Sequence, residues 1–476
     1  MKNIRVRFAP SPTGKMHLGN IRMALLNFLF AKQKNGTFIL RIEDTDLERN
    51  MDHGEKKIIE DLNFLGLTYD EGPICEGPHK PYLQSERQHI YQEKLEELIR
   101  TQKVYRCFCS QELLEEKKKK QIEKGLPPRY DKTCATLSED MIKQKLKVNL
   151  PFVWRLAINQ DAIIEVKNMD RGIMRFELKN FPDFALTRPD GTFTFLFVNF
   201  VDDWLMKITH VIRGEDHLSN SAMQGALFDA FAVMMPTYWH LPMICNQDGK
   251  ILSKRDYGSS LDDLIQEGFL PHAILNYLGS WGTSLNPEIQ SLEELVSNYN
   301  FENLHSSGPI KYDVEKLKWF NHKWINLIEE KELLKFVKPF LSESFPESIK
   351  IPTEKLIYLI NKVKTNAQTL KDFSNFLDFY FEKPKTNKQT IIEFLGEEKA
   401  STVLDLITEG INKTDNPDFF LENLKLKAKE LNLKLKEVFG TLRYILTGKL
   451  EGIGSHDLLN ILDWDEIKNR LNDYTS

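Results

Sequence analysis

Residues 4–42 follow the order strand, turn, helix, strand, and this order constrains the fold more than any other feature of the chain. Residues 4–9 are apolar enough for a buried strand, and the turn formers of residues 10–14 follow. Residues 20–34 repeat apolar side chains with a helical period, and residues 37–42 form a second strand-like run. Two strands joined by a crossover helix make a βαβ unit, so we predict a parallel sheet whose ligands bind beyond the carboxyl ends of its strands.

The remaining segments differ in charge and in hydrophobic pattern. Residues 100–150 hold thirteen Lys or Arg against seven Asp or Glu, whereas the whole chain carries a net charge of −5. Further strands are expected over residues 192–198 and 206–213, with residues 214–217 opening a helix. Helix-rich α/β sequence continues to about Asn300, and beyond Tyr312 the chain is typical of amphipathic helices. We therefore predict an α/β protein with a basic insertion and an all-helical C-terminal region.

Composition excludes several classes of protein. A chain of 476 residues with 41% hydrophobic side chains buries several cores, so it is neither disordered nor, at a pI near 6.2, a histone-like basic protein. Its longest apolar runs are far shorter than the ~18 residues of a membrane span. We expect no leader peptide, because residues 1–5 continue directly into the first strand-like segment. Five cysteines do not make a disulfide framework. We expect a cytoplasmic protein that contacts no membrane.

Two motifs are typical of phosphate binding. His17 and Gly19 stand at the mouth of the first helix, where free N–H groups favour an anion and His17 can donate to phosphate. Residues 249–255 place three cations and a serine around a glycine turn, which suits a loop that clamps a triphosphate. Taken alone, this second motif is more commonly a solvated basic turn. The order and separation of the two motifs, about 230 residues, are those of class I aminoacyl-tRNA synthetases.

Over its whole length the chain resembles bacterial-type glutamyl-tRNA synthetases. The matching stretches are residues 7–20, 40–46, 70–73, 81–87, 208–217, 240–242 and 252–255. The resemblance implies a Rossmann-like class I catalytic domain with an acceptor-binding insertion, followed by an all-α anticodon-binding region. The expected segments are a first catalytic half (1–105), an acceptor-stem insertion with a zinc site (106–190), a second catalytic half with the ATP loop (191–310), a helical stem-contact domain (311–370) and an anticodon-binding domain (371–476).

The resemblance also implies the activity, which is ATP-dependent ligation of L-glutamate to tRNA through a glutamyl-adenylate. The expected cofactors are ATP as a substrate and Mg²⁺ on its phosphates. The expected partner is tRNA(Glu), with tRNA(Gln) as a second substrate in organisms that charge it with glutamate. We expect a monomer that does not bind DNA.

By resemblance, Arg7 and Arg213 surround the glutamate and Glu43 pairs with its α-ammonium group. His17 and Lys254 would stabilise the pentacovalent phosphorus. The other implied glutamate or adenylate residues are Ala9, Ser11, Phe195, Asn199 and Asp216, and the implied ATP residues are His17, Gly19, Lys250, Ser253, Lys254 and Arg255.

Two positions depart from the family pattern. Phe195 stands where many members have a tyrosine, and Ile251 stands where the ATP loop usually begins with a lysine. Lys250, one position earlier, is a candidate replacement for that lysine, and the alternative is a weakened ATP loop.

The basic insertion carries a candidate zinc site. The family often holds zinc here with a Cys-x-Cys pair, a third cysteine and a histidine, which in this chain is replaced by Thr136. Related enzymes use a tyrosine four residues before the last cysteine, so the implied ligands are Cys107, Cys109, Tyr130 and Cys134, with reduced metal-free cysteines as the alternative. The cations expected to meet acceptor-stem phosphates are Lys117, Lys118, Lys119, Lys120, Lys124, Arg129 and Lys132, although any one of them is equally typical of a solvated helix.

Three other functions share parts of this pattern. A glutaminyl-tRNA synthetase is disfavoured because its anticodon region is a β-barrel, and a short tRNA-modifying paralogue is disfavoured by the length of the chain. A non-catalytic tRNA-binding paralogue is supported only by Ile251 and Phe195. Pyrophosphate exchange that depends on glutamate and tRNA discriminates between them.

Overall fold

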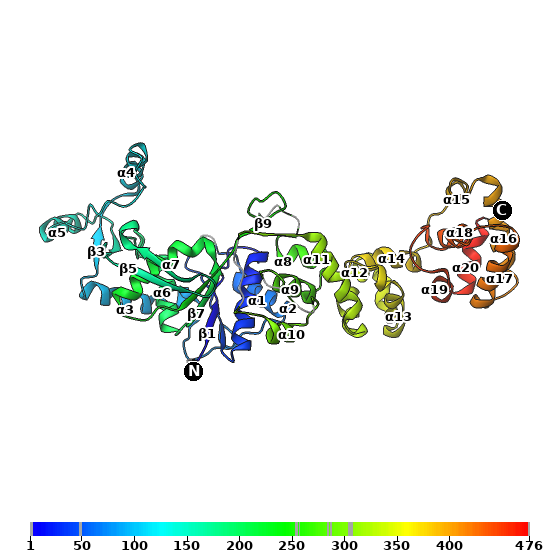
Figure 1. The fold of residues 1–476 in the computed structure, drawn as a ribbon, viewed down its shortest axis with the longest axis horizontal. Coiled ribbons are helices and arrows are strands. Elements are labelled where there is room, and N and C mark those ends of the chain that lie inside the picture. Colours follow the sequence, from blue (N-terminus) through cyan, green and yellow to red (C-terminus); the bar gives the residue numbers. More distant parts are fainter. Residues whose placement is uncertain are drawn as a thin grey trace. The chain divides into compact units, whose positions relative to one another are not determined.

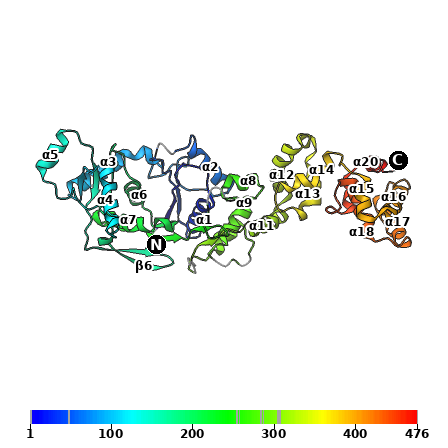
Figure 2. The same cartoon turned by 90° about the horizontal axis from the view of Figure 1, so that it is seen from above.

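The structure is a computed structural model that describes residues 3–46, 50–252, 256, 258–282, 285, 288–302 and 308–474. It divides the chain into two compact units, Met1–Leu264 with Leu275–Val314 and Ile265–Ile274 with Glu315–Ser476. The first unit contains strands and helices, whereas the second is helical, as Figures 1 and 2 show. The predicted class, an α/β catalytic region followed by an all-helical region, is confirmed.

The predicted βαβ unit is present. Strand β1 (Arg5–Phe8) pairs in parallel with β2 (Thr37–Leu40), and helix α1 (Leu18–Gln33) crosses between them (Figure 1). Helix α1 begins two residues earlier than the periodicity suggested, because His17 caps it: its side chain accepts a hydrogen bond from the Asn20 backbone N–H.

A second parallel pair lies beside the first. Strands β7 (His210–Gly214) and β8 (Thr237–Leu241) are parallel, and the Thr209 N–H donates to the Arg5 carbonyl oxygen at 2.9 Å. Hydrogen bonds therefore connect β1 to the segment that enters β7. The hairpin of β5 (Ile163–Asn168) and β6 (Gly172–Glu177) extends the sheet in the order β6-β5-β8-β7. The carboxyl ends of β1, β2, β7 and β8 consequently gather on one side, where the functional site is found.

The strand expected over residues 192–198 is wrong. Helix α6 (Phe195–Leu205) begins there, and only Phe193 makes an isolated bridge, to Thr187. Every residue from Phe197 to Asp203 is buried. A helix buried on nearly all sides shows no clear 3.6-residue period, so its aromatic run imitates a buried strand. The strand expected from residue 206 likewise begins only at His210, because Met206 ends α6 and Lys207 turns the chain with a φ of 57°.

The basic insertion has little core of its own. Strands β3 (Val104–Cys107) and β4 (Val153–Leu156) pair antiparallel at its base. Helices α4 (Gln111–Glu123) and α5 (Glu139–Lys147) contain no buried residue along their described lengths, and both project away from the sheet in Figure 1. A segment that buries so little apolar surface needs another source of stability.

The remaining elements of the first part of the chain are α2 (Gly54–Phe64), α3 (Gln88–Arg100), α7 (Leu218–Ala230), β9 (Ile244–Cys245), α8 (Leu261–Gln266), α9 (Pro271–Gly279), α10 (Leu292–Asn298) and β10 (Ile310–Lys311), with 3₁₀ turns at Gln84–Arg87, Leu178–Asn180 and Glu215–His217.

From residue 314 on, the described chain is helical, as its amphipathic pattern predicts. The helices are α11 (Val314–Leu327), α12 (Glu330–Ser344), α13 (Thr353–Val363), α14 (Asp372–Phe381), α15 (Lys388–Leu395), α16 (Glu397–Ile411), α17 (Pro417–Glu430), α18 (Leu435–Thr447), α19 (Ser455–Ile461) and α20 (Trp464–Asn472), with 3₁₀ turns at Pro346–Lys350 and Lys364–Asn366. In the part of the chain that the structure describes, no helix is long and apolar enough to cross a membrane. The five-segment division of the chain stays a prediction.

Candidate functional site

Two adjoining cavities open at the carboxyl ends of the parallel strands. The smaller has a volume of about 520 Å³, the larger one of about 670 Å³, and His17 lines both. The smaller cavity is lined by these residues that the sequence predicted for glutamate: Arg7, Ala9, Ser11, Glu43, Phe195, Asn199 and Arg213. The larger is lined by His17, Gly19 and Asp216, and also by Ile251. Residues from distant parts of the chain thus meet where the sheet predicts a ligand site.

Helix α6 brings its functional side chains to one face. Phe195, Asn199 and Asp203 are four residues apart, so helix α6 places all three on one side within about 12 Å along its axis. A strand would also place them on one face but would spread them over about 26 Å. Phe195 and Asn199 line the smaller cavity, and the Phe195 ring lies 5.5 Å from the His217 ring, centroid to centroid. The Phe195 ring, which replaces the tyrosine of many family members, therefore packs against His217 in the wall of the smaller cavity.

Arg213 carries a positive charge that forms no ion pair with any residue that the structure describes. Its side chain is 4% exposed, and its Nη2 donates to Ser221 Oγ at 2.6 Å, while Nε and Nη1 have no hydrogen-bond partner. No carboxylate in the described part of the chain lies within 4.0 Å of this guanidinium. Burial accordingly lowers the pKa of Arg213. A buried charge with two unpaired donors at a cavity wall is suited to a ligand carboxylate.

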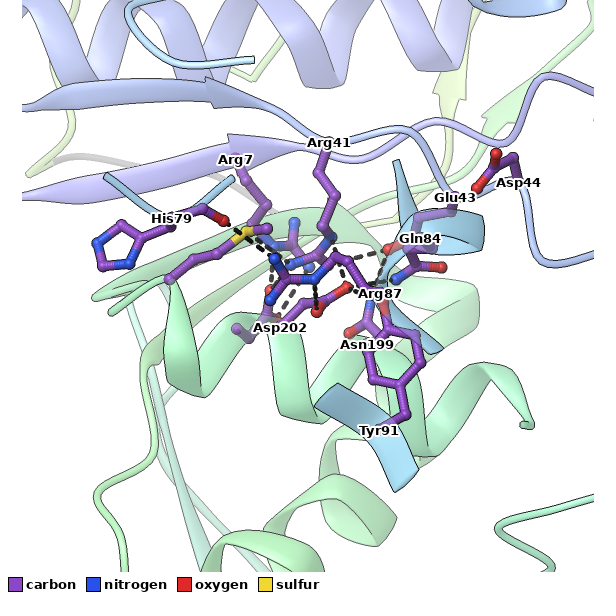
Figure 3. A network of polar contacts seen from close by, with 12 residues as sticks. Arg7, Arg41, Glu43, Asp44, His79, Gln84, Arg87, Tyr91, Asn199 and Asp202 are labelled. Carbon is purple, nitrogen blue, oxygen red and sulfur yellow. Dashed lines mark hydrogen bonds and ion pairs between the residues drawn. The ribbon is translucent and has the colours of Figure 1, made fainter. Parts of the chain in front are cut away.

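Arg7 lines the same cavity but is already paired. Its Nε donates to Asp203 Oδ1 at 3.1 Å, and Nη1 of Arg41 donates to the same oxygen at 2.7 Å. Figure 3 shows Arg7 and Arg41 side by side at this cluster. Burial alone would raise the pKa of the Asp203 carboxyl, but the two arginines outweigh burial and lower it. Arg7 therefore contributes less net charge to the cavity than Arg213 does.

Two hydrogen bonds hold the Glu43 carboxylate in place on the cavity wall. Its Oε1 accepts hydrogen bonds from Arg41 Nη2 at 2.9 Å and from Asn199 Nδ2 at 2.6 Å (Figure 3), and Gln224 Nε2 donates to Asn199 Oδ1 at 2.7 Å. Burial raises the pKa of Glu43, against the attraction of Arg41. The cavity thus has a carboxylate and a guanidinium on its wall, which matches an amino acid with an ammonium group and a side-chain carboxylate.

Sequence reasoning missed the buried ion cluster behind this wall. Asp202 is fully buried and accepts hydrogen bonds from Arg87 Nε at 2.7 Å, Tyr91 OH at 2.9 Å and Gln84 Nε2 at 2.9 Å (Figure 3). The available signal was the adjacent pair of acids inside the mostly apolar run of α6. Adjacent acids at such a position need cationic or hydrogen-bonding partners in the interior.

His17 is oriented by the helix that it caps. Its Nδ1 accepts from the Asn20 N–H at 3.3 Å, so the neutral ring carries its proton on Nε2, the atom that can donate to a phosphate. A Cβ at Gly19 would lie 2.9 Å from His17 Cε1, so glycine is needed for this ring position. The expected place of both residues at the helix mouth is confirmed; their roles toward ATP stay predictions.

The ATP loop is described only in part. Ser253, Lys254 and Arg255 lie outside the described residues. Ile251 lines the larger cavity with 63% of its side chain exposed, whereas Lys250 is not among the lining residues. The backbone N–H of Lys250 donates to Asn246 Oδ1 at 3.1 Å, which holds the turn before the loop.

The three cysteines of the insertion meet. The sulfur atoms of Cys107, Cys109 and Cys134 all lie within 4.8 Å of one another, and the Cys109 and Cys134 sulfurs are 3.6 Å apart. The Tyr130 hydroxyl is at the same place, where it accepts from the Cys134 N–H at 3.0 Å. Hydrogen bonds from Tyr130 and Arg155 outweigh burial and lower the pKa of Cys107. Three sulfurs and a phenol oxygen at this spacing fit a tetrahedral zinc site.

The cations of the insertion are only partly available to a partner. Lys117 pairs with Asp131 at 2.9 Å, Lys120 with Glu116 at 2.5 Å, and Lys132 with Asp183 at 3.1 Å. Lys118, Lys119 and Lys124 are exposed, and Arg129 donates to the Lys179 carbonyl oxygen at 3.2 Å. Contact with tRNA phosphates stays a prediction for all of them.

Comparison with known proteins gives a consistent result. The family model described as "tRNA synthetases class I (E and Q), catalytic domain" matches residues 3–319, and "Anticodon binding domain" matches residues 332–475. The chain is 38% identical to Glutamate--tRNA ligase 1 of Pseudothermotoga lettingae (98% of this chain, 99% of that protein) and 35% identical to Glutamate--tRNA ligase of Finegoldia magna (99% of each). A crystal structure of a glutamate tRNA ligase from Elizabethkingia meningosepticum, in complex with its amino acid, superposes with a TM-score of 0.89 at 32% identity over 99% of each chain.

Proposed function

The chain belongs to the class I tRNA synthetases for glutamate and glutamine, and from this premise we propose that it ligates L-glutamate to tRNA with ATP, through a glutamyl-adenylate. The helical region after residue 314 and the curated relatives both support glutamate over glutamine. The single observation that carries the substrate is Arg213, a buried guanidinium with two unpaired donors on the cavity wall.

An in-line displacement at phosphorus followed by an acyl transfer accounts for the reaction. First, an oxygen of the glutamate α-carboxylate attacks the α-phosphorus of ATP and pyrophosphate leaves. Then a ribose hydroxyl of the terminal adenosine of tRNA attacks the glutamyl carbonyl carbon and AMP leaves. Neither step needs a side-chain nucleophile, so the protein acts by positioning and by stabilising charge.

The residues of the two cavities divide this work. Arg213 would bind the side-chain carboxylate and Glu43 the ammonium group in the smaller cavity. His17, between the cavities, would donate to the α-phosphate as negative charge develops on it. Mg²⁺ would offset charge on the phosphates, and the carboxylates of Asp216 and Asp263 on the larger cavity offer the oxygen ligands that it prefers.

The direct test is exchange of labelled pyrophosphate into ATP, measured with L-glutamate and tRNA present. We expect exchange with glutamate and at least ~100-fold less with glutamine, because a site that pairs a buried charge rejects a neutral analogue. A chain that binds tRNA without exchange under any amino acid would instead be the non-catalytic paralogue. Charging of purified tRNA(Glu) and tRNA(Gln) then establishes which tRNA is used.

The ATP loop yields a separate prediction from the sequence. Lys254→Ala is expected to lower kcat strongly with little change in the KM for ATP, because its cation would act on charge that develops as pyrophosphate leaves. Lys250→Ala should have a smaller effect, and Ile251→Lys should be neutral or favourable, since Ile251 is exposed on the larger cavity. Steady-state kinetics of the three variants check this. A silent Lys250→Ala together with a many-fold gain from Ile251→Lys would contradict compensation by Lys250.

We also propose that the cysteines of the insertion bind a zinc ion. We expect elemental analysis of protein purified without chelators to give close to one zinc per chain, held by Cys107, Cys109, Cys134 and Tyr130. Cys134→Ser should then remove the metal and lower the melting temperature, because helices α4 and α5 of the insertion contain no buried residue that would hold them in place. Cys75→Ser, at an exposed cysteine outside the cluster, is the control. A metal-free protein that melts unchanged in Cys134→Ser would show that packing alone holds the insertion.

The remaining partners follow from this function. We propose that the exposed cations of the insertion contact the acceptor stem, and that the enzyme works as a monomer in the cytoplasm, where tRNA is charged. Binding of tRNA should weaken steeply with salt, as for any phosphate contact.

A further inference from the structure

Behind Arg213 lies a row of buried, uncharged polar groups. Arg213 Nη2 donates to Ser221 Oγ, which is 2.7 Å from His240 Nε2, and His240 Nδ1 is 2.9 Å from Asn168 Nδ2. Ser221 and His240 are fully buried, and Asn168 is 6% exposed. These residues come from α7, β8 and β5, so tertiary packing alone brings them together.

The hydrogen-bond partners determine where each proton lies. Asn168 Oδ1 accepts from the Asp170 N–H at 3.2 Å, which turns the amide nitrogen toward His240. Nδ1 of His240 therefore accepts, and the proton of the neutral ring is on Nε2, which donates to Ser221 Oγ. The hydroxyl accepts from both the imidazole and the guanidinium, and its own hydrogen points to the His217 carbonyl oxygen at 3.4 Å.

This row adds no negative charge beside Arg213. Burial and the neighbouring charge of Arg213 lower the pKa of His240 to about 3, so the ring is neutral at physiological pH. Arg7, on the same cavity, shows the opposite arrangement because Asp203 neutralises it. One cavity thus contains an arginine held by a carboxylate and an arginine held by neutral groups only.

We propose that Ser221 and His240 determine the preference of the smaller cavity for a charged over an uncharged amino-acid side chain, by holding Arg213 without neutralising it. Both act through Arg213 and are positioning residues. The inference rests on the proposed function and deepens it: the substrate class is an amino acid with a side-chain carboxylate, and its amide is the neutral comparison. A carboxylate at position 221 would replace the substrate as the partner of Arg213.

The first test changes the charge behind Arg213. Ser221→Asp is expected to raise the Kd for L-glutamate by at least ~50-fold and to change that for L-glutamine by less than ~3-fold, whereas Ser221→Ala should raise the glutamate Kd by less than ~10-fold. Calorimetry on the full chain with each amino acid measures these constants. The KM for ATP should stay within about twofold, since the larger cavity contains neither residue. Equal losses in the two variants, or an unchanged glutamate-to-glutamine ratio in Ser221→Asp, would overturn the inference.

The second test removes the imidazole while keeping the site neutral. His240→Phe should raise the glutamate Kd by about tenfold, because the Ser221 hydroxyl loses its donor, and His240→Gln, which retains an N–H, should restore part of it. His210→Phe is the matched control, a half-buried histidine of β7 outside both cavities. If Ser221→Asp does not fold, the variants His240→Phe and His240→Gln decide. Wild-type affinity for glutamate in His240→Phe then overturns the inference. A wild-type chain that binds no glutamate would instead contradict the proposed function itself.

Discussion

Arg213→Ala is expected to lower glutamate-dependent kcat/KM by at least ~100-fold, equivalent to about 2.7 kcal/mol of lost transition-state binding. The reason is that the Arg213 guanidinium is buried on the smaller cavity with two donors, Nε and Nη1, that have no partner among the described residues, so a substrate carboxylate there has much to gain from it. Aminoacylation kinetics with varied glutamate measure the loss. Arg213→Lys should recover only part of it, because an ammonium group lacks the bidentate fork.

The matched control is Arg175→Ala. Arg175 is exposed on β6, pairs with Glu165 at 2.9 Å, and lines neither cavity. An exposed pair of this kind contributes little, so the control should retain wild-type kinetics. Near-normal kcat and glutamate KM in Arg213→Ala would remove the basis of the substrate assignment.

Asp202→Ala is expected to have the largest effect on stability, a decrease of about 3 to 5 kcal/mol in the free energy of unfolding. The substitution removes a carboxylate that accepts from Arg87, Tyr91 and Gln84, and it leaves a buried guanidinium without its counter-ion. The substitution is expected to destabilise the fold without removing a contact to a ligand, because Asp202 lines neither cavity.

Chemical denaturation followed by circular dichroism measures this change. Asp202→Asn keeps the shape and one acceptor, so its loss should be smaller than that of alanine. Asp229→Ala, at an exposed aspartate of α7, should unfold within about 0.5 kcal/mol of wild type. A small effect of Asp202→Ala would mean that water or a shifted side chain compensates for the missing carboxylate.

Local patterns determined much of what was predicted correctly. The βαβ unit follows from apolar runs and a helical period within about forty residues, and the place of His17 at the mouth of α1 from the turn before that helix. The helical C-terminal region follows from amphipathic periodicity. Because parallel strands carry their ligands at their carboxyl ends, these patterns also indicated where Glu43 and Arg213 would lie.

Local sequence patterns predicted the wrong secondary structure where a segment is buried on all sides rather than on one face. The sequence predicts a strand over residues 192–198, where helix α6 begins, because most side chains of α6 are buried on all sides, which removes the period that identifies a helix. The error mattered for the site, since a helix brings Phe195, Asn199 and Asp203 within about 12 Å along its axis, whereas a strand would spread them over about 26 Å.

By itself the sequence determined the class of the fold and the residue types that surround the substrate. Only the tertiary structure decided which arginine is available to it. Arg7 and Arg213 both lie near the carboxyl ends of parallel strands, β1 and β7, but the counter-ion of Arg7 lies 196 positions away, and the neutral support of Arg213 comes from three different elements. The charge that a buried group presents depends on partners that no local pattern contains, because desolvation and pairing act through space rather than along the chain.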